Sequence, residues 1–442
     1  MTPIPKDMAD GPGRTEQFVA DLRSLANSPR ELWIVYLMKF LESVGYFTMY
    51  SMIPIFLSSD HGLSDAEAGG VTGAWATAIS LVVFIAGFVA DAMGVKRALF
   101  WAALSTAVGR TLMAFAPGLH GVYAALALGV WGIGCMKPTM NAAVRSYTST
   151  ATVAFAFSLY YVVMNVGSVT QGPIITEFRI WFKEGVVVGG HSFSAAQAIF
   201  LVGGVCSTVN VCLALLLRDQ PPGAAAPPAV AGTRNPFMIA REVLRERTFW
   251  TFLAFISLLT MVRLIFQHAH LTWPKYTMRA FGEDFAWAWY WSINPLMVIF
   301  LTPFATALTR KMKPYPVIVF GSVISSLSVF AMAFSTTIGA SVVFIVILSL
   351  GEILWSPRLY EYTATIAPRG RESSYMGLSE VPMFLAKPVA GVLSGLMLTR
   401  YMPETGARDP QIMWLIIGAV TLAAPVAMLF TRRWLEAPDR IG

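Results

Sequence analysis

The sequence predicts an all-α membrane protein of about twelve transmembrane helices, arranged as two bundles of six. The chain of 442 residues is 56% hydrophobic and only 13% charged, whereas soluble domains carry about 25% charged residues. About a dozen apolar stretches are each long enough to cross a hydrocarbon core of roughly 30 Å. A proline-rich segment near the middle of the chain leaves six of these stretches on either side.

Turn residues and charge clusters set the ends of the predicted spans to within a few residues. Glycine, methionine and aromatic residues are plentiful in the chain, as expected where helices pack closely in lipid. The predicted spans cover residues 32–57, 68–90, 97–116, 121–146, 151–177, 195–217, 248–271, 286–309, 314–335, 339–365, 373–399 and 411–431.

The distribution of basic residues predicts the topology. If the N-terminus is cytoplasmic, 20 of the 32 basic residues fall on the inner side, six in outer loops and six within the spans. Cytoplasmic loops carry an excess of Lys and Arg, so both termini are expected inside. The net charge of +7 is therefore a topological signal rather than a sign of nucleic-acid binding.

Composition also predicts the segments outside the bundles. The first 30 residues are polar and lack the apolar core of a cleavable signal peptide, which favours the cell inner (plasma) membrane. In the linker, PFMIAREVLRER (236–247) has the pattern of a short amphipathic helix on the inner membrane surface. The predicted segments are a cytoplasmic tail (1–31), a first bundle (32–217), a linker (218–247), a second bundle (248–431) and a tail (432–442).

Ten charged residues lie inside the predicted spans. A charge at the bilayer centre costs at least about 2.5–3.5 kcal/mol on insertion scales, so these side chains are expected to line a polar path between helices. Six are basic, and a cavity with that excess favours anionic cargo. They are Lys39, Glu42, Arg110, Lys137, Arg263, Glu352, Arg358, Glu361, Glu380 and Lys387.

Other classes of protein find little support. No Walker loop, HExxH or GxSxG motif is present, and a membrane-embedded enzyme would need a facing nucleophile and base. The three cysteines have no metal-ligand spacing. We therefore expect a transporter with no cofactor, no metal and no nucleic-acid partner.

A glycine-rich loop follows the second predicted span. GFVADAMGVKR (87–97) resembles the "G-x-x-x-D-x-x-G-x-K/R" loop of the major facilitator transporters, although an ordinary polar turn would look similar. The resemblance implies two six-helix bundles that rock around a central site. It assigns a conformational role to Gly87, Asp91, Gly94, Lys96 and Arg97.

Further segments resemble one branch of that superfamily, the proton-dependent oligopeptide transporters. They are GIGCMKPTMNA (132–142), YYVVMNVGS (160–168), SINPLMVIFLTPFATAL (292–308), SLGEILWSP (349–357) and TIAPRGRESSYMGL (365–378). Their order along the chain matches that of the family. The resemblance implies proton-coupled uptake of short peptides.

The first span departs from this family. Where the family reads E-x-x-E-R-F-x-Y-Y, this chain reads KFLESVGYF (39–47), with Lys39, Ser43 and Phe47 in place of Glu, Arg and Tyr. A binding-site tyrosine of the second span is replaced by Ser80. These departures partly dismantle the aromatic cage that suits di- and tripeptides in the family and change the first-span charge pattern.

Candidate proton-coupling residues are Glu42, Lys137 and Glu380. A cation near a buried carboxylate lowers the pKa of that carboxylate. If substrate draws a neighbouring lysine away, Glu42 binds a proton more readily and acts as a switchable proton carrier. Lys137 is the expected partner of Glu42. The alternative is a static ion pair that only fixes helix packing.

Candidate substrate residues lie on both halves. Lys137 is expected to bind a substrate carboxylate, and Glu352 to bind an ammonium with the help of Asn294, unless Glu352 serves only as a structural partner of Arg263 or Arg358. The full predicted binding set is Lys39, Tyr46, Tyr50, Lys137, Asn165, Gln267, Asn294 and Glu352.

The remaining intramembrane charges suggest a gate formed by Arg358, Glu361 and Lys387. Arg110 has no assigned role, and His268 and His270 are interpreted as polar groups near the outer mouth. The expected function is proton-coupled symport of short peptides or peptide-like zwitterionic or anionic compounds by a monomer. The competing hypothesis is proton-antiport export of amphiphilic or anionic compounds.

Overall fold

The computed structural model describes residues 28–148, 152–218, 245, 247–309, 311–366 and 381–435, and nearly all of them are helical. The first half contains α2 (Arg30–Ser59), α3 (Asp65–Met93), α4 (Val95–Phe115), α5 (Gly118–Ser146), α6 (Val153–Trp181) and α7 (Ala195–Leu216). A small hairpin of β1 (Val186–Val188) and β2 (His191–Phe193) joins α6 to α7.

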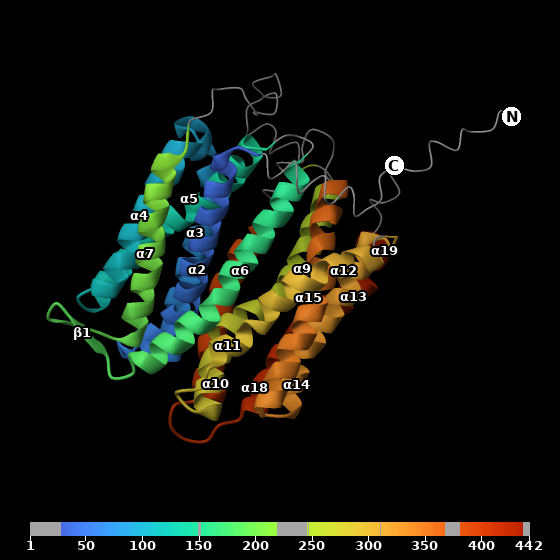
Figure 1. Ribbon diagram of the computed structural model, residues 1–442. Coiled ribbons are helices and arrows are strands. Elements are labelled where there is room, and N and C mark those ends of the chain that lie inside the picture. Colours follow the sequence, from blue (N-terminus) through green and yellow to red (C-terminus); the bar gives the residue numbers. More distant parts are fainter. Residues whose placement is uncertain are drawn as a thin grey trace.

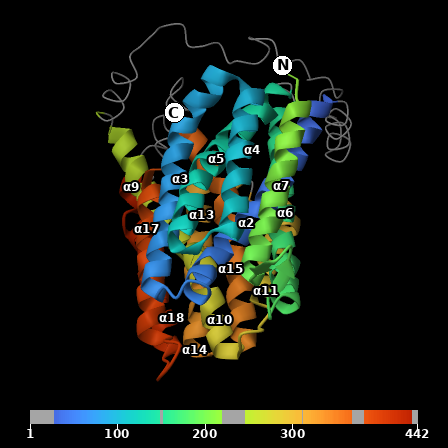
Figure 2. The same ribbon diagram turned by 90° about the vertical axis from the view of Figure 1, so that its left-hand side faces the viewer.

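The second half follows the same plan with more interruptions. It contains α9 (Arg247–Leu271), α10 (Trp273–Phe281), α11 (Trp287–Trp291), α12 (Ile293–Thr309), α13 (Pro314–Ser328), α14 (Phe330–Phe334), α15 (Ile338–Ile366), α17 (Val381–Tyr401), α18 (Pro410–Phe430) and α19 (Arg432–Leu435). Figure 1 shows the two halves side by side, and Figure 2 shows the same bundles from the first-half side.

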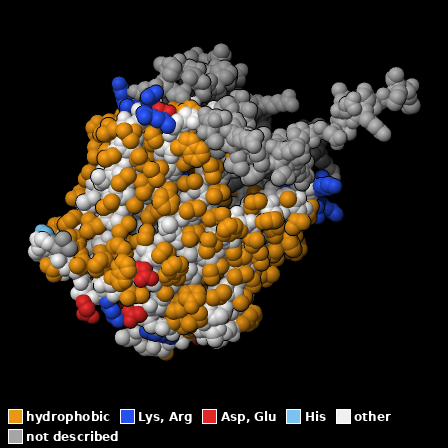
Figure 3. Space-filling view, viewed as in Figure 1, with side chains coloured by type: hydrophobic (Ala, Val, Ile, Leu, Met, Phe, Trp, Pro, Cys, Tyr) orange, Lys and Arg blue, Asp and Glu red, His pale blue; other side chains and the backbone are white. Residues whose placement is uncertain are grey.

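The predicted spans agree with the helices that the structure describes. Ten helical segments are long and apolar enough to cross a membrane, and α6 and α17 are two further long helices in the same bundles. Hydrophobic side chains cover the middle of the molecule, and charged groups gather at its two ends (Figure 3). This is the surface expected of a protein embedded in lipid.

Two predicted spans are interrupted rather than continuous. The span expected at 286–309 divides at Ser292 into α11 and α12, and the span expected at 314–335 divides at Val329 into α13 and α14. Pro295 has no backbone N–H to donate to residue 291, which accounts for the first interruption. The predicted amphipathic linker helix lies almost entirely outside the described residues.

The hydrophobic cores differ between the two ends of the bundle. The hairpin end carries β1 and β2, and the opposite basic end carries Arg30, Lys96 and Arg97. At the hairpin end, one buried cluster contains residues of both halves, including Ile53, Trp75, Trp273, Trp291 and Trp414.

At the basic end the halves have separate clusters. One surrounds Leu32 and Leu99 of the first half, and the other surrounds Phe249, Tyr315 and Tyr362 of the second half. Among the described residues, the halves therefore share a core only toward the hairpin end.

Candidate functional site

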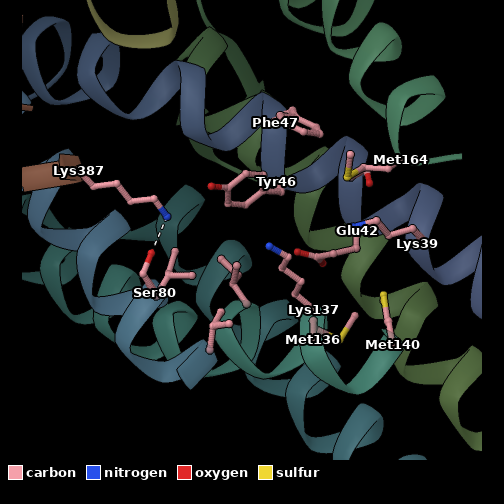
Figure 4. Close-up of a pocket in the computed structure, with 14 residues that line it drawn as sticks. Lys39, Glu42, Tyr46, Phe47, Ser80, Met136, Lys137, Met140, Met164 and Lys387 are labelled. Carbon is pink, nitrogen blue, oxygen red and sulfur yellow. Dashed lines mark hydrogen bonds between the residues drawn. The ribbon is translucent and has the colours of Figure 1, made fainter. Parts of the chain in front are cut away.

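A cavity of about 200 Å³ lies on the first-half side of the seam between the halves. Its walls come from α2, α3, α5 and α6, and Lys387 of α17 reaches it from the second half (Figure 4). The lining residues are Lys39, Glu42, Ser43, Tyr46, Phe47, Ile79, Ser80, Val83, Ile133, Met136, Lys137, Met140, Met164 and Lys387.

Helical spacing explains why α2 contributes five of these side chains. Residues three or four apart share one face of a helix, and Lys39, Glu42 and Tyr46 follow that spacing. The prediction that Lys39 and Glu42 share a face is thus confirmed, since both line the cavity.

Glu42 forms its ion pair with Arg110 of α4. Arg110 Nη2 donates to Glu42 Oε1 at 2.8 Å, Nη1 donates to Oε2 at 3.0 Å, and Nη1 also donates to Ser207 Oγ at 2.7 Å. Both side chains are buried. A planar guanidinium matches the two oxygens of a carboxylate, so this geometry is of the strong bidentate kind.

This pairing corrects the expected Glu42–Lys137 ion pair, which the structure does not form. Arg110 reaches Glu42 because two glycines leave room for the guanidinium. A Cβ on Gly45 would lie 2.5 Å from Arg110 Nη1, and a Cβ on Gly203 would lie 3.3 Å from its Cδ. The sequence showed a charge at Arg110 but not the glycines that let it cross to α2.

Lys137 instead presents its amine to the cavity. Its side chain is exposed although it lies within α5, nine residues before the end of that helix. Within the described part of the chain it has neither a hydrogen bond nor an ion pair. Figure 4 shows its Nζ pointing toward the Glu42 carboxylate across the cavity, so it can meet an incoming anion.

Two further ammonium groups line the same space. Buried Lys39 lies over the ring of Tyr160, with Nζ 5.0 Å from the centroid. Lys387 donates to Ser80 Oγ at 2.5 Å. The sequence resemblance led us to expect a tyrosine at the position of Ser80, and the smaller hydroxyl of serine accepts this lysine from the opposite half.

Tyr46 and Tyr50 connect the cavity to the hairpin end. Their rings stack with centroids 5.8 Å apart, and Tyr46 also stacks on Trp75 at 6.4 Å. Tyr50 donates a hydrogen bond to Gln267 Oε1 of α9. Of the predicted binding residues, Tyr46 therefore lines the cavity, whereas Tyr50 and Gln267 join the two halves beyond it.

Glu352 and Asn294 meet as predicted, but away from this cavity. Asn294 Nδ2 donates to Glu352 Oε2 at 2.9 Å and to Ser349 Oγ at 3.1 Å. Arg263 lies over the Trp355 ring at 5.4 Å. None of these residues lines the cavity that contains Lys137. The structure thus separates the predicted carboxylate and ammonium sites.

Other predicted residues lie elsewhere. Asn165 donates to its own helix at Tyr161 O, at 2.9 Å. Arg358 donates to Thr309 Oγ1 at 3.1 and 3.3 Å near the basic end. Lys387 lies in the cavity rather than beside Arg358. Glu380 and the side chain of Glu361 fall outside the described residues.

The glycine-rich loop has the turn that its sequence predicts. Gly94 lies between α3 and α4 with φ of 80°, a conformation that glycine adopts without strain. Lys96 and Arg97 follow in the first turn of α4. Gly87 and Asp91 are on α3, and the surroundings of these two residues are not described.

The two histidines join the hairpin-end seam. His270 Nδ1 and Ser51 Oγ are 3.2 Å apart across the halves. His268 Nδ1 lies 2.8 Å from Thr272 Oγ1, which in turn lies 2.7 Å from Ser394 Oγ. Both histidines thus lie inside the closed packing at the hairpin end.

A charged cluster seals the hairpin end. Asp65 at the start of α3 accepts from Lys275 at 2.7 Å and from Arg279 at 2.6 and 3.1 Å, both on α10 of the other half. Arg279 also bonds to Glu404 at 3.1 Å. Burial lowers the pKa of Lys275, and the Asp65 carboxylate opposes that shift.

Sequence reasoning missed this cluster because it counted Lys275 and Arg279 as outer-loop charges. Their spacing of four residues was the available signal, since it places both on one helical face. The sequence did not indicate that Asp65 is their partner, because Asp65 lies some two hundred residues away in the first half.

Comparison with known proteins places this fold in a family. The sequence profile of the Major Facilitator Superfamily matches residues 35–379. The chain belongs to the major facilitator superfamily. It is accordingly a multi-pass membrane transporter and not an enzyme.

The similar proteins include ones named for two different activities. "Multidrug resistance protein MdtH" of Yersinia enterocolitica is 23% identical, covering 90% of this chain and 94% of that protein. "Dipeptide and tripeptide permease B" of Aliivibrio fischeri is also 23% identical, covering 92% of this chain and 94% of that protein.

Solved structures agree on the fold. A crystal structure of a POT family transporter in complex with 5-aminolevulinic acid superposes with a TM-score of 0.74 at 16% identity, covering 92% of this chain and 97% of that one. A structure of a proton-dependent oligopeptide transporter superposes with a TM-score of 0.72 at 19% identity, covering 92% and 97%. The resemblance to this branch predicted from the motifs is thus confirmed at the level of fold.

Proposed function

We propose that this transporter carries short peptides or peptide-like zwitterionic or anionic compounds together with protons. The observation that carries the proposal is the exposed amine of Lys137 in a cavity at the seam of the two halves. An ammonium in a low-dielectric cavity attracts a carboxylate more strongly than it does in water. The relatives named as peptide permeases favour the peptide end of this range.

Alternating access is the proposed mechanism. The halves share one hydrophobic core at the hairpin end and have separate cores at the basic end. Rocking the halves about the central cavity would open the hairpin end and seal the basic end. The proposed orientation has the basic end and both termini in the cytoplasm of a cell with this protein in its inner (plasma) membrane, where the protein works as a monomer.

Proton coupling is proposed at Glu42, with Lys137 as the group that senses substrate and Glu380 as a second carrier. Arg110 donates two hydrogen bonds to the Glu42 carboxylate. A substrate carboxylate bound at Lys137 would reduce the positive field at Glu42 and favour its protonation. Proton binding and substrate binding would then reinforce each other.

The test uses purified protein in liposomes with radiolabelled dialanine and an imposed inward proton gradient. The gradient should drive accumulation by the native protein. Lys137→Gln should reduce it at least tenfold without loss of folded protein, because Lys137 has no partner among the described residues. Full accumulation by this variant would remove Lys137 from the mechanism.

Glu42→Gln tests coupling separately. The amide oxygen still accepts a bond from Arg110 but cannot titrate. This variant should exchange labelled for unlabelled dialanine across the membrane yet ignore the proton gradient. Gradient-driven accumulation by Glu42→Gln would show that another group carries the proton.

Proton-antiport export is the second candidate function. The similarity to MdtH covers nearly the whole chain, and Met136, Met140 and Met164 give the cavity an adaptable apolar wall. If the protein is such an antiporter, an amphiphilic compound added outside proton-loaded liposomes should enter them while protons leave in exchange. Release with an amphiphilic cation or anion but not with dialanine would favour this candidate over symport.

A further inference from the structure

We propose that the first half binds an anionic phospholipid, with one acyl chain in a groove between α4 and α5 and the phosphate at Lys96 and Arg97. This site is separate from the substrate cavity and does not depend on the transport proposal. Figure 2 shows α4 and α5 running side by side. The groove between them has a volume of about 440 Å³ and is closed at one end by Met93, the last residue of α3.

Small buried residues form the floor of the groove, and bulky exposed residues form its walls. Ala98, Ala102 and Cys135 lie at the floor and are only 4%, 1% and 3% exposed. Trp101 and Trp131 lie at the walls and are 54% and 44% exposed. This contrast in side-chain size makes a narrow channel on the outer surface of the bundle.

The interior of the groove is suited to hydrocarbon. None of its described lining residues carries a charge. Its two hydroxyl groups already have partners on α5, because Ser105 Oγ donates to Leu128 O at 2.9 Å and Thr139 Oγ1 donates to Cys135 O at 2.7 Å. An occupant therefore gains little from polar groups here and much from apolar contact.

The length of the groove matches one leaflet of a bilayer. Along α4 it extends from Ala98 to Val108, which at 1.5 Å per residue is about 15 Å. The hydrocarbon core of a bilayer is roughly 30 Å thick, so the groove covers about half of it. Because α4 begins at the basic end, the groove faces the leaflet on that side.

The mouth of the groove is positively charged. Lys96 and Arg97 directly precede Ala98 in the first turn of α4, and neither has a hydrogen bond or an ion pair in the part of the chain that the structure describes. This first turn contains no acidic residue, and Gly94 provides no side-chain cap. The free N–H groups of a helix start attract phosphate, and basic pockets on membrane proteins bind anionic headgroups.

A second copy of the chain fits the groove less well than a lipid does. In a symmetric dimer about an axis normal to the membrane, the two grooves would face each other with their mouths at the same end. Lys96 and Arg97 of one copy would then lie near the same residues of the other copy, and like charges repel. A lipid phosphate instead neutralises them.

The experiment measures lipid binding to the purified full-length protein by native mass spectrometry from a neutral detergent. The probes are phosphatidylglycerol and phosphatidylcholine with identical palmitoyl and oleoyl chains, together with free glycerol phosphate. Each Lys or Arg near a headgroup strengthens binding of an anionic lipid roughly fivefold. The first phosphatidylglycerol should therefore bind at least tenfold more tightly than the first phosphatidylcholine.

Two variants separate the headgroup from the acyl chain. Lys96→Gln/Arg97→Gln should bring the affinity for phosphatidylglycerol to within threefold of that for phosphatidylcholine. Ser105→Phe fills the groove without changing its charge, and it should weaken binding of both lipids at least fivefold. Both variants should keep the melting temperature that the native protein has in lipid-free detergent, which shows that they fold.

Lys311→Gln/Lys313→Gln is the matched control. These two exposed lysines directly precede α13 in the second half, across the molecule from α4 (Figure 1). Removing them takes away the same charge from the same end of the protein. This variant should keep the full preference for phosphatidylglycerol.

Four results would each overturn the inference. The first is equal affinity of the native protein for the two lipids, and the second is a preference that survives in Lys96→Gln/Arg97→Gln. The third is displacement of phosphatidylglycerol by an equal concentration of glycerol phosphate, which would show that the acyl chain adds nothing. The fourth is a dimer that Ser105→Phe dissociates while lipid binding stays native, which would make the groove an interface between copies.

Discussion

Two buried charge clusters in this protein have similar chemistry but different positions. Arg110 and Glu42 pair within the first half, whereas Asp65 of the first half pairs with Lys275 and Arg279 of the second. All five side chains are almost fully buried. A pair inside one rigid half can persist through a transport cycle, whereas a pair between halves must break if the halves rock apart.

The two clusters are therefore expected to have different roles, one in folding and one in the conformational equilibrium. Removing Arg110 from the pair within one half should damage folding, since the Glu42 carboxylate is left buried without compensation. Removing a partner between halves should instead favour the conformation in which the remaining charges reach water. The following changes test that distinction in order of expected effect.

Arg110→Met should have the largest effect. It leaves the Glu42 carboxylate buried without its guanidinium and should cost about 3–5 kcal/mol of folding stability. The measurement is the apparent melting temperature of the purified protein together with its yield as a monodisperse species. The double variant Arg110→Met/Glu42→Gln should recover part of the loss, because no buried charge then remains unpaired. A native melting temperature for Arg110→Met alone would contradict a structural role for this pair.

Gly69→Ala should come next, because α3 and α17 touch at this position. A Cβ on Gly69 would lie 2.3 Å from the carbonyl oxygen of Gly391, a backbone atom that cannot move aside easily. Overpacking of this kind costs about 1–3 kcal/mol. In Gly69→Ala this cost destabilises the conformation that is sealed at the hairpin end. Transport should fall, and the hairpin end should open more often.

Gly70→Ala is the matched control for this change. A Cβ at Gly70 meets nothing within 4 Å, and alanine in a helix is about 0.5–1 kcal/mol more favourable than glycine. Gly70→Ala should therefore transport normally and melt no lower than the native protein. Equal loss of transport in both variants would show that the effect does not arise from the contact between halves.

Asp65→Asn should have a smaller and purely conformational effect. The amide keeps the shape of the carboxylate but loses its attraction for Lys275 and Arg279. We expect the hairpin end to open about tenfold more often, equivalent to about 1.4 kcal/mol. The reporter is a cysteine at the fully buried Ser51, in a background where Cys212 is alanine, labelled from the hairpin side by a membrane-impermeant maleimide. A native labelling rate in the Asp65 variant would argue against this cluster as a gate.

Lys183→Gln should have the smallest effect. Lys183 and Asp284 also pair between the halves, at 2.6 Å, but both side chains are more than half exposed. Exposed ion pairs are screened by water and salt. Neither transport nor Ser51→Cys labelling should change measurably. A large increase in labelling would show that burial does not decide which bridges hold the halves together.

The fold was predictable because lipid imposes strict requirements on the sequence. Each apolar stretch had to be long enough to span the bilayer, so the helices fall close to the predicted boundaries. Interruptions such as that at Ser292 were harder to predict, because proline is tolerated within membrane helices when nearby groups satisfy the backbone. Ser292 supplies such a bond to the neighbouring helix: its Oγ donates at 2.9 Å to Val169 O of α6, the carbonyl that Pro173 leaves without an N–H partner.

The site was only partly predictable. The positions of Lys39, Glu42 and Tyr46 on one face followed from helical spacing, and so did their presence in the cavity. The partner of Glu42 did not, because it depended on the missing side chains of Gly45 and Gly203 on two different helices. Distances between helices decide such contacts, and a single sequence gives no direct measure of them.

Separation of Glu352 from Lys137 was unpredictable for the same reason. Both are intramembrane charges near the middle of their spans, so sequence alone suggested a common chamber. In the structure, Asn294 and Ser349 hold the Glu352 region together within the second half. Glu352 therefore does not face Lys137 across one cavity.

The central claim is that the two halves separate at the hairpin end during function. Electron–electron double resonance between spin labels at positions 183 and 284 tests it most directly, because these side chains touch across the seam yet contribute little to stability. The account predicts two distance populations, one short and one longer, with the longer one growing in Asp65→Asn. A single short distance that persists in that variant and in the presence of dialanine would contradict it.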